Sequence, residues 1–160
     1  SPPKADAPQA QAQRKAITMS YVSMMAHCVW GTKNRANILE PTKRIALFQH
    51  ILEHGREKNI YVDTINGHAD HVHALVSLGA DQSVAKVVQL MKGESAHWAN
   101  ANNVFSFPLE WSEDYFAASV SQSSLEKVRE YIRNQEEHHR TMTFAEEYKK
   151  FVEGYGFQLG

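Results

Sequence analysis

The order of strand-like and helix-like patterns constrains the fold of this chain more than any other feature. Apolar runs of strand length occur at 20–30, 59–66, 71–78 and 115–121. Two stretches with apolar residues at helical spacing separate them, one at 42–59 and one that begins at Asp81 or Ser83. Strand, helix, strand, strand, helix, strand is the split β-α-β order. The sequence therefore predicts an α+β, ferredoxin-like antiparallel sheet with two helices on one face.

A third helical stretch follows the last strand and is extra to that fold. It runs from Ser123 to Arg140, and Ser123 with Glu126 forms the S-x-x-E pattern of a capping box. A further short helix is possible within "FAEEYKKF". We predict a disordered leader or cloning remnant at 1–18, one domain at 19–150 and a tail at 151–160.

Tyr131 and Gln135 lie four residues apart on this extra helix and are therefore neighbours on one face. Gln135 extends the apolar stripe of Val128 and Ile132, where a hydrophobic residue is expected. A buried amide needs a polar partner. The pattern indicates a polar site under this helix; an ordinary tyrosine on a helix surface is the alternative.

Two histidines, His71 and His73, open the third strand at a spacing of two. Alternation places them on one face, while the other face is apolar throughout and belongs against the two helices: Val72, Ala74, Val76 and Leu78. Imidazoles side by side can hold one metal ion. Two strand histidines without a function are the alternative that this pattern leaves open.

The composition limits the cellular compartment and the binding partners that we expect. The 160 residues include one cysteine, carry a net charge of −1 and contain no apolar run long enough for a membrane span. We therefore expect a soluble, cytoplasmic protein. A basic cluster suits phosphate contacts, although the net charge is low for a nucleic-acid binder. The residues proposed for such contacts are Lys33, Arg35, Lys43, Arg44, Lys92 and Arg133.

The motifs together resemble the single-tyrosine HUH transposases, the IS200-like transposase family. His71-Val72-His73 corresponds to the HUH motif, and "VREYIRNQEEHH" is similar to that family's tyrosine helix. The segments "HCVWGTKNR" and "YFAASVS" are also similar. The resemblance covers about residues 19–148.

The resemblance implies a metal-assisted DNA transposase with a ferredoxin-like fold. Tyr131 would attack DNA to form a 5′-phosphotyrosine, and His71, His73 and Gln135 would bind a divalent metal, Mg or Mn. Zn is also compatible with imidazole ligands. The implied partners are single-stranded DNA hairpins and a second copy of the chain, without a membrane or a small-molecule cofactor.

Other function classes remain open at this stage. One is a replication or relaxase endonuclease that shares the histidine pair. Another is a non-catalytic nucleic-acid-binding module, and a third is a zinc hydrolase that uses water as its nucleophile. For His138 and His139, which follow Gln135, we expect a solvated helix end.

Overall fold

The computed structural model of the protein describes residues 21–154. The predicted leader at 1–18 and residues 155–160 of the predicted tail lie outside the described residues. The helices and strands are, in order, β1 (Met24–Gly31), η2 (Lys33–Arg35), α2 (Pro41–Glu57), β2 (Tyr61–His68), β3 (His71–Leu78), α3 (Val84–Ala101), β4 (Phe116–Val120), η3 (Gln122–Ser124), α4 (Leu125–Arg133), α5 (Gln135–His138) and α6 (Phe144–Gly154).

The four strands form one antiparallel sheet in the order β2-β3-β1-β4. The two central strands pair so that Val29 lies opposite His73 and Cys28 opposite Ala74. This is the strand order of the split β-α-β arrangement. The predicted α+β, ferredoxin-like sheet is confirmed.

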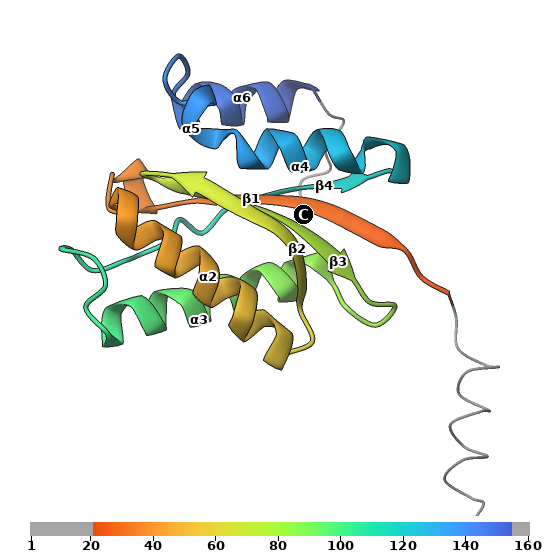
Figure 1. Ribbon diagram of the computed structural model, residues 1–160, viewed down its shortest axis with the longest axis horizontal. Coiled ribbons are helices and arrows are strands. Elements are labelled where there is room, and N and C mark those ends of the chain that lie inside the picture. The colour runs from red at the N-terminus through yellow and green to blue at the C-terminus, as the bar shows by residue number, and fades with distance from the viewer. Residues whose placement is uncertain (1–20, 155–160) are drawn as a thin grey trace, which may run out of the picture.

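Helices α2 and α3 cover one face of the sheet (Figure 1). The main core lies between them and the sheet, and it includes the apolar face of β3 as predicted: Val72, Ala74, Val76 and Leu78. Ser83 caps α3, because its hydroxyl accepts a hydrogen bond of 3.2 Å from the backbone N–H of Lys86. Among residues 21–154, no helix has both the length and the apolar character needed to cross a membrane.

Helices α4, α5 and α6 cover the opposite face of the sheet (Figure 1). Leu75 of β3 packs there against Leu125 and Ile132 of α4. Nearer α6, Val29 and Phe116 pack against Phe144. The sheet is therefore the middle of three layers, and the histidine face of β3 lies beneath the second helical layer.

The predicted single helix from 123 to 140 is wrong in two respects. The chain leaves helical geometry at Asn134, with φ −94° and ψ 24°, and α5 begins after it. Asparagine competes for backbone hydrogen bonds and is a poor helix-interior residue. The predicted capping box is also absent, because Ser124 is the N-cap of α4 and makes no side-chain cap, while the Ser121 hydroxyl bonds the hydroxyls of Ser123 and Ser124.

Gly67 on β2 lies where the sheet has no room for a side chain. A Cβ at this position would lie 2.2 Å from the backbone oxygen of His71, whereas one at Gly93 on α3 would have no atom within 4 Å. We therefore expect Gly67→Ala to lower the free energy of unfolding by about 2 kcal/mol or more. Gly93→Ala should raise it by about 1 kcal/mol, because alanine favours a helix. Urea unfolding measures both, and equal effects would contradict the predicted close approach.

Arg129 ties α4 to the edge of the sheet through a bidentate ion pair with Asp63 of β2. Its Nε and Nη2 atoms each lie 2.9 Å from a carboxylate oxygen of Asp63. The hydrogen bonds from Arg129 lower the pKa of Asp63. A carboxylate with a lowered pKa stabilises the fold above its unfolded pKa of about 4, and this contribution is lost as the pH falls through the folded pKa.

We expect a favourable coupling energy between Arg129→Ala and Asp63→Asn near pH 6.5 and a smaller one near pH 3.5. Urea unfolding of the double-mutant cycle at both pH values measures it. Arg140→Ala is the control, because Arg140 forms an exposed ion pair with Glu137, three residues earlier in the sequence. A coupling energy that does not change with pH would show that the ion pair is not what joins the two elements.

Candidate active site

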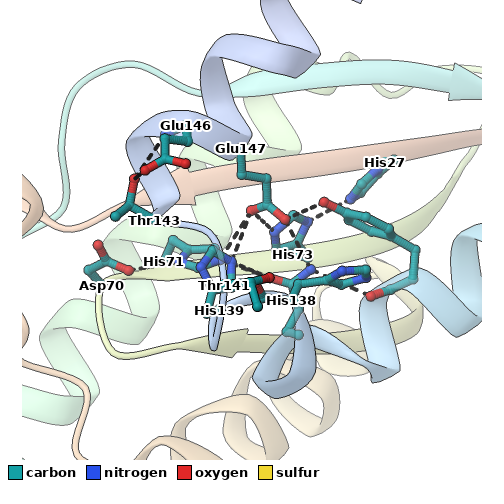
Figure 2. Close-up of polar contacts among 12 residues, drawn as sticks. His27, Asp70, His71, His73, His138, His139, Thr141, Thr143, Glu146 and Glu147 are labelled. Atoms are coloured by element: carbon teal, nitrogen blue, oxygen red, sulfur yellow. Dashed lines mark hydrogen bonds and ion pairs between the residues drawn. The ribbon is translucent and has the colours of Figure 1, made fainter.

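Polar side chains meet between the sheet and the second helical layer, among them His27, His71, His73 and Glu147, which Figure 2 labels. Six of these side chains form one connected set of contacts. They come from β1, β3, α4, α5 and α6: His27, His71, His73, Tyr131, Gln135 and Glu147. Five of the six are buried, and Tyr131 is half-buried. Such groups must bond to one another, because water does not reach them.

His71 and His73 lie side by side on one face of β3, as their spacing predicts. Their ring centroids are 5.1 Å apart, and both residues are fully buried. The Nδ1 atom of His71 donates to Asp70 Oδ1 at 2.8 Å, and its Nε2 lies 2.9 Å from Gln135 Oε1. Both ring nitrogens are thus held in fixed directions.

The carboxylate of Glu147 is at the centre of the site, and sequence reasoning missed it. Its Oε1 lies 3.0 Å from His73 Nε2, 3.4 Å from His71 Nε2 and 3.3 Å from His139 Nε2. The sequence does contain a signal. Glu147 is three residues after Phe144 and four before Phe151, so it shares the apolar face of α6.

Hydrogen bonds from the histidines set the charge of Glu147. Burial alone would raise its pKa, but the three imidazoles around it outweigh burial and hold the pKa well below its usual range. A buried carboxylate that is hydrogen-bonded in this way stays ionised at neutral pH. The site therefore contains a fixed negative charge.

Burial keeps two of the imidazoles neutral. It lowers the pKa of His73 to about 4 and that of His27 to about 3. His73 Nε2 donates to the carboxylate of Glu147, so its Nδ1 accepts the hydrogen bond of 2.8 Å from His27 Nε2. Neutral imidazole is the form that binds metals.

His71 differs from these two. Burial would lower its pKa, but hydrogen bonds to Asp70, Glu147 and Gln135 raise the pKa above its ordinary value. With acceptors at both ring nitrogens, the imidazolium form is stabilised here without a metal ion. A metal that bound His71 Nε2 would displace a proton from it.

The hydroxyl of Tyr131 donates a short hydrogen bond to Glu147 Oε2. Burial and this bond raise the pKa of Tyr131. Gln135 Nε2 donates to the same oxygen at 3.3 Å. The structure thus brings Tyr131 and Gln135 together with the histidine pair in one site, and Glu147 links all of them.

The expectation of a solvated helix end is wrong for His139. Its side chain is 4% exposed, and its Nε2 lies 3.1 Å from Gln135 Oε1. His138 packs against the Tyr131 ring, with centroids 4.4 Å apart. Both histidines therefore belong to the site, because the break at Asn134 turns α5 toward the sheet.

The predicted basic residues divide into exposed and occupied groups. Lys33, Arg35, Lys43 and Arg133 are exposed. Lys33 pairs with Glu110 at 3.2 Å and Lys43 with Glu40 at 3.2 Å. Surface pairs of this kind are weak enough to exchange for a phosphate.

Arg44 and Lys92 are instead used within the fold. Arg44 is 6% exposed, and its guanidinium donates to Leu39 O and to Glu136, each at 3.1 Å. The ammonium of Lys92 donates to the backbone oxygens of Ser112 and Glu113. The prediction of an exposed basic cluster is therefore wrong for Arg44, because this side chain fixes α2 against α5.

The donor atoms of the site fit a divalent metal ion. His71, His73 and Glu147 each offer an atom, and these atoms all lie within 4.8 Å of one another. Gln135 Oε1 lies close by, 2.9 Å from His71 Nε2. Two imidazole nitrogens with carboxylate and amide oxygens suit Mn or Zn as well as Mg.

Comparison with known proteins identifies relatives of the chain. The sequence model of the family described as "Transposase IS200 like" matches residues 20–135. A crystal structure of a candidate transposase from Deinococcus radiodurans R1 is similar, with 20% identity, a TM-score of 0.58 and coverage of 73% of this chain and 94% of that chain.

A second structure, a REP-associated tyrosine transposase bound to a REP hairpin, is 15% identical, with a TM-score of 0.57 and coverage of 75% of this chain and 71% of that chain. Among curated proteins, none matches the sequence. At these identities, the structural likeness concerns the fold alone.

Proposed function

The chain belongs to the IS200-like transposase family, and from this premise we propose that it cleaves and rejoins single-stranded DNA through Tyr131. One observation carries the proposal. The Tyr131 hydroxyl donates to a carboxylate that also bonds both histidines of the H-x-H pair. The proposed nucleophile, a carboxylate that can accept its proton and imidazoles that can bind a metal are thus in mutual contact, which is an arrangement that supports metal-assisted covalent phosphate chemistry.

We propose His71, His73 and Gln135 as metal ligands, as the family resemblance implies, and add Glu147 through its Oε1 atom. The metal is divalent, Mg or Mn, and Zn fits the same donors. When bound there, it would supply positive charge beside the scissile phosphate and its leaving oxygen. The negative charge of Glu147 would strengthen binding of the metal and reduce the net charge facing DNA.

The phenol proton of Tyr131 needs an acceptor before the oxygen can attack. Glu147 Oε2 already accepts a hydrogen bond from this hydroxyl. In the proposed step, the Tyr131 oxygen bonds the phosphorus, the phenol proton moves to Glu147, and the bond from phosphorus to the 3′ oxygen breaks while that oxygen takes up a proton from water. The 5′-phosphotyrosine keeps the bond energy, so attack by a 3′-hydroxyl reverses the step without ATP.

The proposed substrate is a single strand that carries a hairpin, as in the relative solved with a REP hairpin. Arg35 lines a groove beside the site that also contains His68, Asp70 and His139. Together with Lys33 and Lys43, it offers exposed positive charge for backbone phosphates. Because the chain has a net charge of −1, we expect a few local contacts rather than a continuous basic surface.

Tyr131→Phe tests the nucleophile. We expect the wild-type protein, with labelled single strands that flank its gene and Mn²⁺ or Mg²⁺, to form a protein–DNA adduct that survives denaturation. The Tyr131→Phe variant should form no adduct and should still bind the hairpin, because only the attacking oxygen is lost. Denaturing gels detect the adduct, and gel shifts measure the binding.

The other outcomes separate the competing functions. Cleavage that persists in Tyr131→Phe would contradict the tyrosine mechanism and support a hydrolase that uses water. Hairpin binding without cleavage by the wild type would support a binding module. Tyr148→Phe is the matched control, because Tyr148 lies on α6 and its hydroxyl contacts Asp114, away from the histidine pair.

We propose that Tyr131 serves the histidines of its own chain, because its hydroxyl reaches Glu147 within one chain. The proposed second copy then contributes DNA contacts rather than the nucleophile. Mixing Tyr131→Phe with His73→Ala should leave adduct formation absent. Recovery of the adduct in the mixture would show that the tyrosine acts on the partner's site.

Glu147→Gln tests the proposed proton acceptor. Glutamine keeps the shape of the side chain but cannot accept the phenol proton, so we expect adduct formation at saturating Mn²⁺ to slow by about 100-fold or more. Hairpin binding, measured in parallel, checks that the variant keeps its fold. Rapid-quench kinetics measure the rate, and Glu146→Gln, next to it on α6 and exposed, is the control. A rate equal to or above that of the wild type would exclude this role for Glu147.

A further inference from the structure

A second cluster of metal-binding residues lies on the other side of the sheet, outside the proposed active site. His50 and His54 are one turn apart on α2, and Glu94 faces them from α3. These helices form the layer opposite α4 to α6 (Figure 1). The cluster therefore cannot share ligands with His71 and His73.

The three donor groups converge on one point. Glu94 Oε1 lies 2.8 Å from His50 Nε2 and 3.7 Å from His54 Nε2. In a tetrahedral zinc site with bonds of about 2.0–2.2 Å, donor atoms lie about 3.3–3.6 Å apart. The observed separations lie on either side of that range, so small rotations of the side chains suffice to place an ion between them.

Hydrogen bonds account for the contact of His50 with Glu94 but not for that of His54. His50 alone pairs with the Glu94 carboxylate, at 2.8 and 2.9 Å. His54 Nε2 points at the same carboxylate from 3.7 Å, which is too far for a hydrogen bond. A shared metal ion would give the Nε2 atom of His54 a closer partner.

The surroundings hold both rings in place. Trp98 stacks on His50, with centroids 4.0 Å apart and an interplanar angle of 6°. His54 Nδ1 lies 3.3 Å from Glu57 Oε2, which is the carboxylate contact that commonly orients a metal-binding histidine through its other nitrogen. The side chains of His50, His54 and Glu94 are 18%, 28% and 31% exposed, so an ion from solvent can reach them.

We propose that His50, His54 and Glu94 form a second metal site that binds a transition-metal ion of the zinc type and links α2 to α3. Two imidazoles and one carboxylate are donors that favour Zn²⁺, Co²⁺ or Ni²⁺ over Mg²⁺. Three protein ligands leave a fourth position for water. The site is independent of the DNA chemistry, so it stands whether or not Tyr131 is the nucleophile.

Zinc titration of the full chain against a chromophoric chelator tests the site. We expect wild type to bind one equivalent of Zn²⁺ more than His54→Ala or Glu94→Gln, or to bind it at least tenfold more tightly. His97→Ala is the matched control, because His97 is an exposed histidine on α3 outside the cluster. Zinc that binds at His71 and His73 contributes equally to every protein, so it cancels when the variants are compared with wild type.

Two further readouts keep the result independent of folding defects. Zn²⁺ should raise the thermal unfolding temperature of wild type and His97→Ala more than that of His54→Ala. Co²⁺ should give the visible absorption of a tetrahedral site that is weaker in Glu94→Gln than in wild type. Equal stoichiometry, affinity and thermal shift in all four proteins would overturn the proposal and leave the cluster as an ion pair between two helices.

Discussion

The buried carboxylate of Glu147 is the interaction on which the second helical layer depends. It bonds histidines from β3 and the region after α5, and it accepts the Tyr131 hydroxyl from α4. Without these bonds, α6 would bury an uncompensated charge. Removing one partner from a buried ionic network costs about 3–5 kcal/mol in other proteins. The same bonds that hold α4 and α6 on the sheet therefore also place the tyrosine beside the histidines.

One face of β3 belongs to the main core, and the opposite face carries the histidines of the proposed active site. Val72, Ala74 and Val76 complete the main core with α2 and α3, so the strand is held rigidly from one side. His71 and His73 are thereby fixed on the opposite face, at full burial. A one-residue slip in register would exchange the two faces and destroy both. Gly67 supports this register, because β2 approaches the His71 backbone too closely there for any side chain.

Sequence reasoning predicted the sheet, the direction of the histidine face and the contact of Tyr131 with Gln135. These features follow from local spacing, since strand side chains alternate and helix residues four apart are neighbours. It missed Glu147 because the two strand histidines that contact this carboxylate lie 74 and 76 residues away along the chain. It placed His139 in solvent because the break at Asn134 is a single-residue deviation that no periodicity reveals. Arg44 was expected on the surface for a similar reason, since its partner Glu136 lies on α5. The contacts missed join distant segments, and only the assembled fold brings them together.

The histidine clusters on the two sides of the sheet combine similar donors in different surroundings. At His71 and His73, full burial and an ionised carboxylate hold the imidazoles close to half-buried Tyr131, the proposed nucleophile. His50 and His54 are partly exposed, and among the described residues they contact Glu94, Glu57 and Trp98. A metal ion at the proposed active site would therefore lie next to Tyr131, whereas one at the second site would join two helices. Both clusters offer imidazole and carboxylate donors, so the difference between them comes from the side chains that surround those donors.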